Sequence, residues 1–206
     1  MSAALEQLLR HPAIWRGGHD PKPEPGHVAT GRPELDAVLP GGGWPRGALT
    51  EILTDQQGIG ELSLLLPALD ELTAEGLWAA WVAPPMVPYA PALQARGCDP
   101  ERVLVVKPGD ELQSLWAAEQ LLHTKATGAV LLWARQADDR RLRRLQLAAE
   151  SGRAIAVIFR NAAYARQSSP AALRMALSTQ TDPASGMQVD VLKCRGRLPA
   201  RSFCIR

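Results

Sequence analysis

The stretch from Ala48 to Leu66, ALTEILTDQQGIGELSLLL, constrains the fold more than any other part of the chain. It begins with apolar and β-branched residues that are typical of a short strand. A polar turn with Gly58 and Gly60 follows, and then an apolar run that suits a buried helix. A strand, a glycine loop and a helix in this order present backbone N–H groups and a helix N-terminus to a phosphate. The stretch therefore predicts an α/β fold with the scaffold of a nucleotide site.

The residues that end this loop do not supply the chemistry of a nucleotide site. A working phosphate loop ends in Gly-Lys-Ser/Thr, whereas this one reads Gly60, Glu61 and Leu62. A carboxylate replaces the lysine that neutralises phosphate, and an isobutyl group replaces the hydroxyl that holds magnesium. Two negative charges about 4 Å apart repel by about 1 kcal/mol even in bulk water. We therefore expect a degenerate phosphate loop (Gly58, Gly60, Glu61), with no cofactor and no catalytic residue.

The flanking segments resemble a RecA-type ATPase core from about Thr30 to Ser178. Thr30–Gly47, TGRPELDAVLPGGGWPRG, has the order of the RecA lead-in, and the elements after the loop follow the RecA order. The combination of VLPGGGWPRG, a GIGEL loop and a VAPP strand end is similar to the ImuA family. SulA-type cell-division inhibitors share the GxGEL loop and the APP turn. The resemblance implies a RecA-like α/β core, a mostly parallel twisted sheet flanked by helices, with antiparallel strands at the C-terminus.

Against this family pattern, two further ATPase elements are absent. The apolar strand expected over residues 77–83 ends in Ala83 and two prolines, where a RecA-type ATPase has the glutamate that activates water. The strand expected over 128–133 ends in Trp133 and Ala134, where a Walker B strand ends in an aspartate. With the lysine also missing, the resemblance implies a pseudo-ATPase and not an enzyme.

The sequence predicts two helices with distinctive features, one interrupted by a proline and one rich in arginine. The apolar run after the loop predicts a helix over residues 59–75, with a kink or a break because Pro67 lies well inside it. Residues 138–151 predict a second helix, which is strongly basic. Four arginines on a helix more often form a solvated face than a DNA contact; they are Arg140, Arg141, Arg143 and Arg144.

The N-terminal part is predicted to be a separate unit: residues 1–29 form a short helix and a Pro/Gly-rich linker, and residues 30–206 form the RecA-like domain. The first unit carries an apolar set that we call the N-terminal arm: Leu5, Leu8, Leu9, Ile14 and Trp15. The arm folds back onto its own domain, or it packs on another chain. RecA relatives clasp the adjacent subunit with this segment, so the resemblance favours a homo-oligomer or a docking arm.

Charge is distributed unevenly along the chain. The net charge of +2 is too small to demand nucleic acid as a partner. From Arg160 onward, however, eight Lys/Arg residues stand against two aspartates, which gives this segment +6. The RecA resemblance places a second DNA-binding loop at residues 160–170. Candidate contacts to DNA or a partner are Arg160, Tyr164, Arg166, Lys193, Arg195, Arg197 and Arg201. A solvated surface and a structural loop are the alternatives, and direct DNA contact stays open.

The remaining composition indicates a cytoplasmic protein. The three cysteines (Cys98, Cys194, Cys204) lack metal-ligand spacing, so we expect them to be reduced and structural. The four histidines follow no ligand periodicity, and we expect no metal site. No apolar run reaches the length of a membrane span, and the N-terminus lacks a signal-peptide pattern.

The functional reading rests on the family resemblance. It implies a non-catalytic adaptor of an error-prone translesion DNA synthesis complex in the SOS response. Its partner would be an inactive Y-family polymerase homologue of the ImuB type, with RecA as a further candidate. The alternative is a SulA-type inhibitor that binds FtsZ; the full lead-in and the long basic C-terminus favour the ImuA pattern. An ATP-binding enzyme would need a displaced lysine, and neither Lys107 nor Lys125 lies in a glycine-rich loop.

Overall fold

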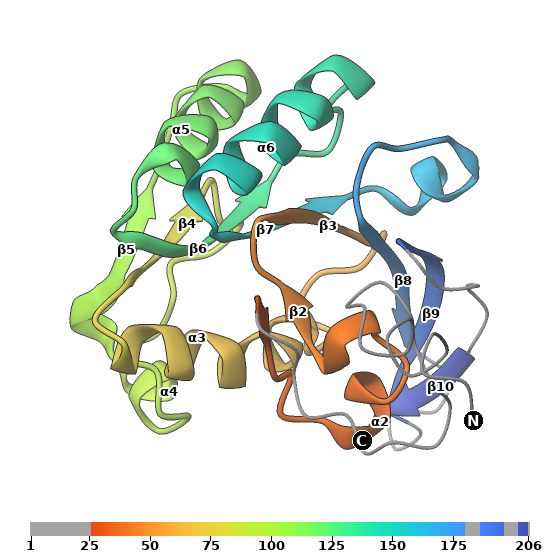
Figure 1. Ribbon diagram of the computed structural model, residues 1–206, viewed down its shortest axis with the longest axis horizontal. Helices are drawn as coiled ribbons and strands as arrows, with labels where there is room; N and C mark the ends of the chain where they lie inside the picture. The colour runs from red at the N-terminus through yellow and green to blue at the C-terminus, as the bar shows by residue number, and fades with distance from the viewer. Residues whose placement is uncertain (1–25, 180–185, 196–201, 206) are drawn as a thin grey trace, which may run out of the picture.

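The computed structural model describes residues 26–179, 186–195 and 202–205. In this part of the chain an eight-stranded sheet is covered by helices on both faces (Figure 1). The strand order is β10-β9-β8-β3-β7-β6-β4-β5. The six strands from β8 to β5 in this order pair in parallel, while β9 is antiparallel to both β8 and β10. The structure thus confirms the mostly parallel sheet with antiparallel C-terminal strands.

The elements have the following bounds. The strands are β1 (His27–Val28), β2 (Trp44–Pro45), β3 (Ala48–Leu53), β4 (Trp78–Val82), β5 (Val103–Val106), β6 (Thr127–Trp133), β7 (Ile155–Arg160), β8 (Leu173–Thr179), β9 (Met187–Cys194) and β10 (Ser202–Ile205). The α-helices are α2 (Pro33–Asp36), α3 (Leu66–Ala74), α4 (Ala90–Gln94), α5 (Glu111–His123) and α6 (Asp139–Gly152). Short 3₁₀ helices are η1 (Pro40–Gly42), η2 (Glu61–Leu64), η3 (Pro100–Arg102) and η4 (Ala162–Arg166).

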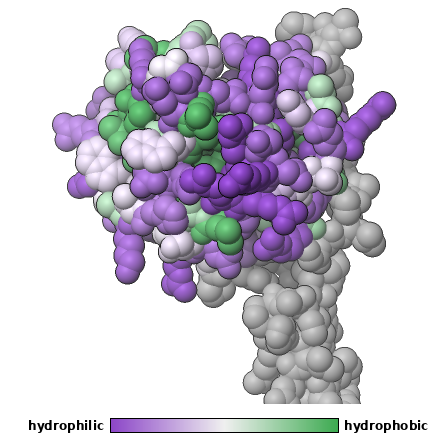
Figure 2. Space-filling model, turned by 90° about the horizontal axis from the view of Figure 1, so that it is seen from above, coloured by the Kyte–Doolittle hydropathy of each residue, from purple (hydrophilic) through white to green (hydrophobic). Residues whose placement is uncertain are grey.

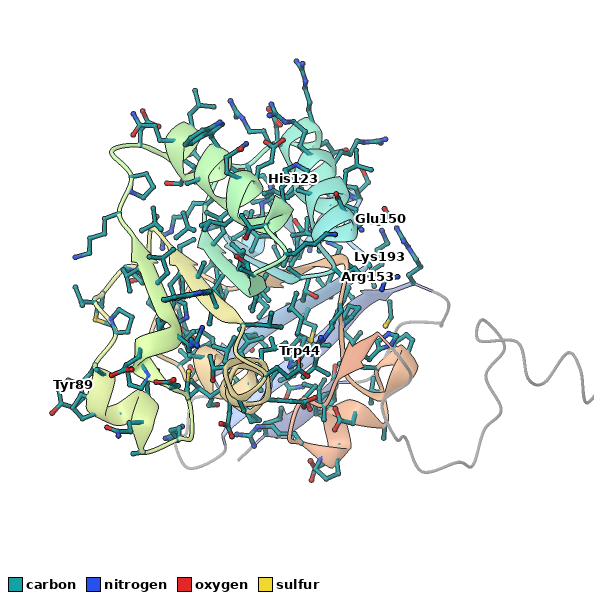
Figure 3. All side chains as sticks on the ribbon, turned by 60° about the vertical axis from the view of Figure 1, so that its left-hand side comes forward. Trp44, Tyr89, His123, Glu150, Arg153 and Lys193 are labelled. Carbon is teal, nitrogen blue, oxygen red and sulfur yellow. The ribbon has the colours of Figure 1, made fainter. Side chains whose placement is uncertain are left out.

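The central strands are buried on both faces, as their continuous apolar sequence requires. All six residues of β3 are buried. Ile52 belongs to the core on the side of α3 and α4, whereas Leu49 packs on the opposite side against α5 and α6. Figure 1 shows these helix pairs below and above the sheet. The first core also contains Trp44, whose ring N–H donates to the carbonyl of Leu64 and which lies in the interior in Figure 3.

The helix expected over residues 59–75 is divided in two. Residues 61–64 form the single 3₁₀ turn η2, and α3 begins only at Leu66. Pro67 lies in the first turn of α3, where its missing N–H and fixed φ are tolerated. The predicted break is therefore present, but it lies on the N-terminal side of Pro67. As a consequence, no α-helix begins directly at the glycine loop.

The first described residues already belong to the folded unit. His27 and Val28 form β1, which pairs with Pro45 and Trp44 of β2. Val28 is buried in the core next to α3. His27 and Val28, which the sequence assigned to the linker of the first unit, are therefore part of a strand.

The cysteines occupy two different environments. Cys98 and Cys194 are buried, and burial raises the pKa of the Cys98 thiol, with the nearby Asp70 carboxylate adding to the rise. Cys204 instead lies exposed on β10. None of the three forms a disulfide. Among the described residues, no helix is long and apolar enough to cross a membrane.

Gly152 provides a test of the close packing of α5 and α6. A Cβ atom at this position would lie 1.7 Å from the carbonyl oxygen of Leu122 at the end of α5. Gly→Ala in a helix ordinarily stabilises by about 0.5–1 kcal/mol. Here we expect Gly152→Ala to destabilise by about 1–3 kcal/mol or more, because the backbones must separate. Urea unfolding measures the difference.

Gly109→Ala is the matched control. A Cβ atom there would meet only the flexible Gln113 side chain, at 3.4 Å. We expect the free energy of unfolding to change by less than about 0.5 kcal/mol. Equal stability of the two variants would contradict the close approach of the two helices.

Candidate functional site

A cavity of about 350 Å³ opens at the carboxyl edge of the sheet. It lies among the residues that end or follow the four central parallel strands: Thr54 after β3, Ala83 after β4, Trp133 on β6 and Phe159 on β7. Ligands of open α/β sheets bind at this edge, outside the carboxyl ends of the strands. The degenerate loop predicted from the sequence thus lies where a nucleotide site would be.

Glu61 occupies the anion position of its own loop. Its side chain turns back so that Oε1 accepts the backbone N–H of Gly58, with an N···O distance of 3.3 Å. The residue is only 7% exposed and lines the cavity. Its Oε2 atom is buried and has no hydrogen-bond partner among the described residues. A carboxylate of the protein therefore uses a donor that would otherwise be available to a phosphate, and it adds a negative charge to the cavity wall.

Side chains of the loop tie it to the neighbouring strand ends. Gln56 Oε1 accepts the N–H of Thr179, 3.1 Å away at the end of β8. Asp55 Oδ1 accepts the N–H of Ala162 in η4 at 3.1 Å. Gly58 and Gly60 have φ values of 71° and 94°, a backbone conformation that favours glycine. The loop is thus held by its own polar residues, and its shape does not need a ligand.

The ends of β6 and β4 supply apolar and aromatic groups to the cavity. Trp133, at the end of β6, stacks on Phe159 with ring centroids 4.7 Å apart. The ring centroid of Trp81 lies 5.9 Å from that of Trp133. Ala83, after β4, has a positive φ of 53°, and prolines follow it. The ends of β6 and β4 therefore line the cavity with aromatic rings and a proline-containing turn.

A buried ion triad lies beside the cavity. Glu51, fully buried in the middle of β3, accepts hydrogen bonds from Arg160 on β7 and from Arg174 on β8. Arg160 also donates to the carbonyl of Ala137, and Arg174 donates to the carbonyls of Tyr164 and Gln167. Because each guanidinium meets both a carboxylate and a carbonyl, the triad offsets much of the cost of burying its charges.

The ion triad changes the predicted role of Arg160 in the 160–170 segment. Arg160 is not a surface residue: it is 5% exposed, and two of its nitrogens are engaged inside the protein. The expectation that it contacts DNA is corrected by this burial. The Tyr164 ring lies 4.0 Å under the Arg160 guanidinium, so it stacks on the protein's own cation. Arg166 is exposed at the end of η4.

Two of the remaining basic candidates, Lys193 and Arg195, lie near the end of this segment. Lys193, which is labelled in Figure 3, donates to the carbonyl of Ser169 at 2.7 Å, and this bond joins β9 to the end of the 160–170 segment. Burial lowers the pKa of Lys193, and the charges of Arg195 and Arg174 lower it further. Arg195 is exposed at the end of β9. Arg197, Arg201 and the N-terminal arm (Leu5, Leu8, Leu9, Ile14, Trp15) lie outside the described residues.

Sequence reasoning missed the central residue of this region. Glu51 is a lone carboxylate inside an apolar strand, and a buried charge of this kind needs a partner. That signal was available, but its partners are 109 and 123 residues away in the chain. Their identity depends on β3 lying between β7 and β8.

Comparisons with known proteins find relatives of three kinds. The family model described as cell division inhibitor SulA matches residues 47–156. Protein ImuA from Caulobacter vibrioides is 31% identical over 142 residues, which cover 66% of this chain and 58% of ImuA. Protein RecA from Corynebacterium jeikeium is 28% identical over 130 residues, covering 63% of this chain and 34% of RecA. A crystal structure of SulA from Pseudomonas aeruginosa is 25% identical and has a TM-score of 0.45, covering 54% of this chain and 97% of that chain.

The strand order, the loop at the carboxyl edge and the similarity to RecA together define a RecA-like α/β protein. The SulA model matches more than half of the chain, and ImuA matches about two thirds of it. The chain belongs to the ImuA/SulA-related family. It spans 58% of the length of the ImuA relatives that it matches.

Replacing Glu51 tests the ion triad. We expect Glu51→Gln to lower the free energy of unfolding by about 3–5 kcal/mol, because two buried arginines lose their shared counter-charge. Chemical denaturation followed by circular dichroism measures the loss.

The control is Glu75→Gln, which breaks the surface pair between Arg46 and Glu75 (2.7 Å). That change is expected to cost no more than about 1 kcal/mol. A similar small cost for both variants would show that the triad does not stabilise the sheet.

Proposed function

We propose that this chain is a non-catalytic, cytoplasmic accessory protein of SOS mutagenesis, a RecA-like platform that binds a polymerase-like protein of the ImuB type. The observation that carries the proposal is Glu61, which occupies the loop's anion position in place of a lysine. The similarity to ImuA supports the accessory role. With a lysine, a magnesium ligand and a water-activating carboxylate all replaced, the fold keeps its surfaces and loses the groups that stabilise phosphoryl transfer.

The second candidate function is a SulA-type division inhibitor that binds FtsZ. The family model over residues 47–156 favours it. The match to ImuA, over 142 residues, favours the accessory role instead. The two functions therefore differ in their partner, since both use a RecA-like domain without catalysis.

The basic end of the sheet is our candidate contact surface for DNA or an acidic partner. Arg166 and Arg195 are exposed, and Lys193 donates to the carbonyl of Ser169. Arg197 and Arg201 extend the same basic run in the sequence. We further propose that the N-terminal arm packs between chains, and that RecA is an additional partner.

The first test is nucleotide binding. In calorimetric titration with ATP and magnesium, we expect no association of the full chain at useful affinity, because Glu61 repels phosphate and Leu62 offers magnesium no ligand. Unfolding of the same sample by urea serves as the control that the protein is folded. A dissociation constant in the low micromolar range requires about 8 kcal/mol of binding free energy, and it would refute the pseudo-ATPase proposal.

The second test separates the two functions by partner. The tagged full chain is mixed either with the purified polymerase-like homologue or with FtsZ from the same genome. We expect retention of the polymerase homologue and unchanged FtsZ polymerisation. Inhibition of FtsZ polymerisation, without retention of the polymerase homologue, would establish the division-inhibitor alternative.

A further inference from the structure

The outer face of α5 and α6 carries a groove of about 310 Å³. Leu115 and Leu145, both buried, form its floor. Leu112 and Trp116 line it from α5, and Arg141 and Arg144 line it from α6. Figure 2, which looks down on the molecule from this side, shows apolar atoms among strongly hydrophilic ones.

The wall on α5 is apolar and open to solvent. Leu112 is 60% exposed and Trp116 is 61% exposed. They are four positions apart in the sequence, so they lie one turn apart on the same helix face. Single exposed apolar residues are normal on a protein surface. Here two large ones border an apolar floor, and the core of the domain does not use them.

The wall on α6 is cationic. Arg144 forms an ion pair with Glu119 of α5, with an N···O distance of 2.7 Å. Arg141 is therefore the guanidinium of this wall that can bind a carboxylate of another molecule. Arg141 is 3.4 Å from Asp138 in an exposed turn, a pair of a kind that contributes little to stability. Arg141 can therefore exchange this partner for another carboxylate at low cost. Arginine and tryptophan are also the residues in which interface energy concentrates.

We propose that the α5/α6 groove is a docking site for an acidic amphipathic segment of a partner protein. Apolar side chains of the segment pack on Leu112 and Trp116, and a carboxylate on its other flank binds Arg141. This inference deepens the proposed function, since it supplies the surface by which an accessory protein holds its partner.

The charge of the groove selects this occupant over a second copy of the chain. An isologous contact would bring the same patch of both copies together. The arginines of two α6 helices would then share one interface, and like charges across an interface are unfavourable. An acidic segment has the opposite charge on the flank that faces α6.

The direct test uses fluorescence anisotropy with designed helical peptides. The probe has leucines spaced to face one side and glutamates along one flank; a second peptide has lysines in place of the glutamates. We expect the full chain to bind the acidic peptide, and Trp116→Ala to weaken binding at least tenfold. Arg141→Glu should weaken it similarly and should turn the preference towards the lysine peptide.

The control variants alter the same helix outside the groove. Leu147 is 64% exposed and Arg143 is exposed, and neither lines the groove. Leu147→Ala and Arg143→Glu should bind the acidic peptide like the unaltered chain. Equal binding of both peptides, or equal losses in the control and groove variants, would overturn the proposal. Loss of a homodimer in Trp116→Ala, seen by light scattering, would overturn it in favour of a second copy.

Retention of the polymerase-like homologue separates this inference from the proposed function. If the homologue binds the unaltered chain and Trp116→Ala loses it, the groove is its docking site. If Trp116→Ala and Arg141→Glu retain it fully, the groove proposal is wrong and the accessory function stands. If the unaltered chain does not bind the homologue but binds the acidic peptide with the expected pattern, the proposed function fails and the groove remains.

Discussion

Glu51 and its two arginines hold the middle of the sheet together. The carboxylate lies on β3, and each neighbouring strand supplies one guanidinium: Arg160 from β7 and Arg174 from β8. Such a buried triad is tolerated only when every charged group has its partners. The pairing of three strands and the course of the 160–170 segment therefore depend on one another, because Arg174 also binds the carbonyls of Tyr164 and Gln167.

The same strand leads into the loop at the carboxyl edge. There a second carboxylate, Glu61, accepts the N–H of Gly58. Asp55 and Gln56 fasten the loop to η4 and to the end of β8. The contacts that a bound phosphate would make with the loop are thus partly replaced by contacts within the chain. These contacts hold the loop to the strand ends on either side of β3.

Two surfaces of the domain differ in chemical character, one towards β9 and one over α5 and α6. Towards β9, positive charge is crowded: Lys193 is near Arg195 and Arg174, which together with burial lower its pKa. Over α5 and α6, the surface combines exposed Leu112 and Trp116 with arginines. The first surface concentrates positive charge. The second adds apolar contact area, and for that reason it is the more selective of the two.

The sequence by itself determined the strand and loop pattern, because this follows from local composition, and its resemblance to RecA-type cores predicted the mostly parallel sheet. It also predicted the break near Pro67, although α3 begins at Leu66. Only the tertiary structure decided that Arg160 is buried and that Glu51 is its partner. It also decided that Leu112 and Trp116 share a groove with Arg141. The physical reason is distance along the chain: residues more than 20 positions apart meet only after the strands have paired and the helices have packed.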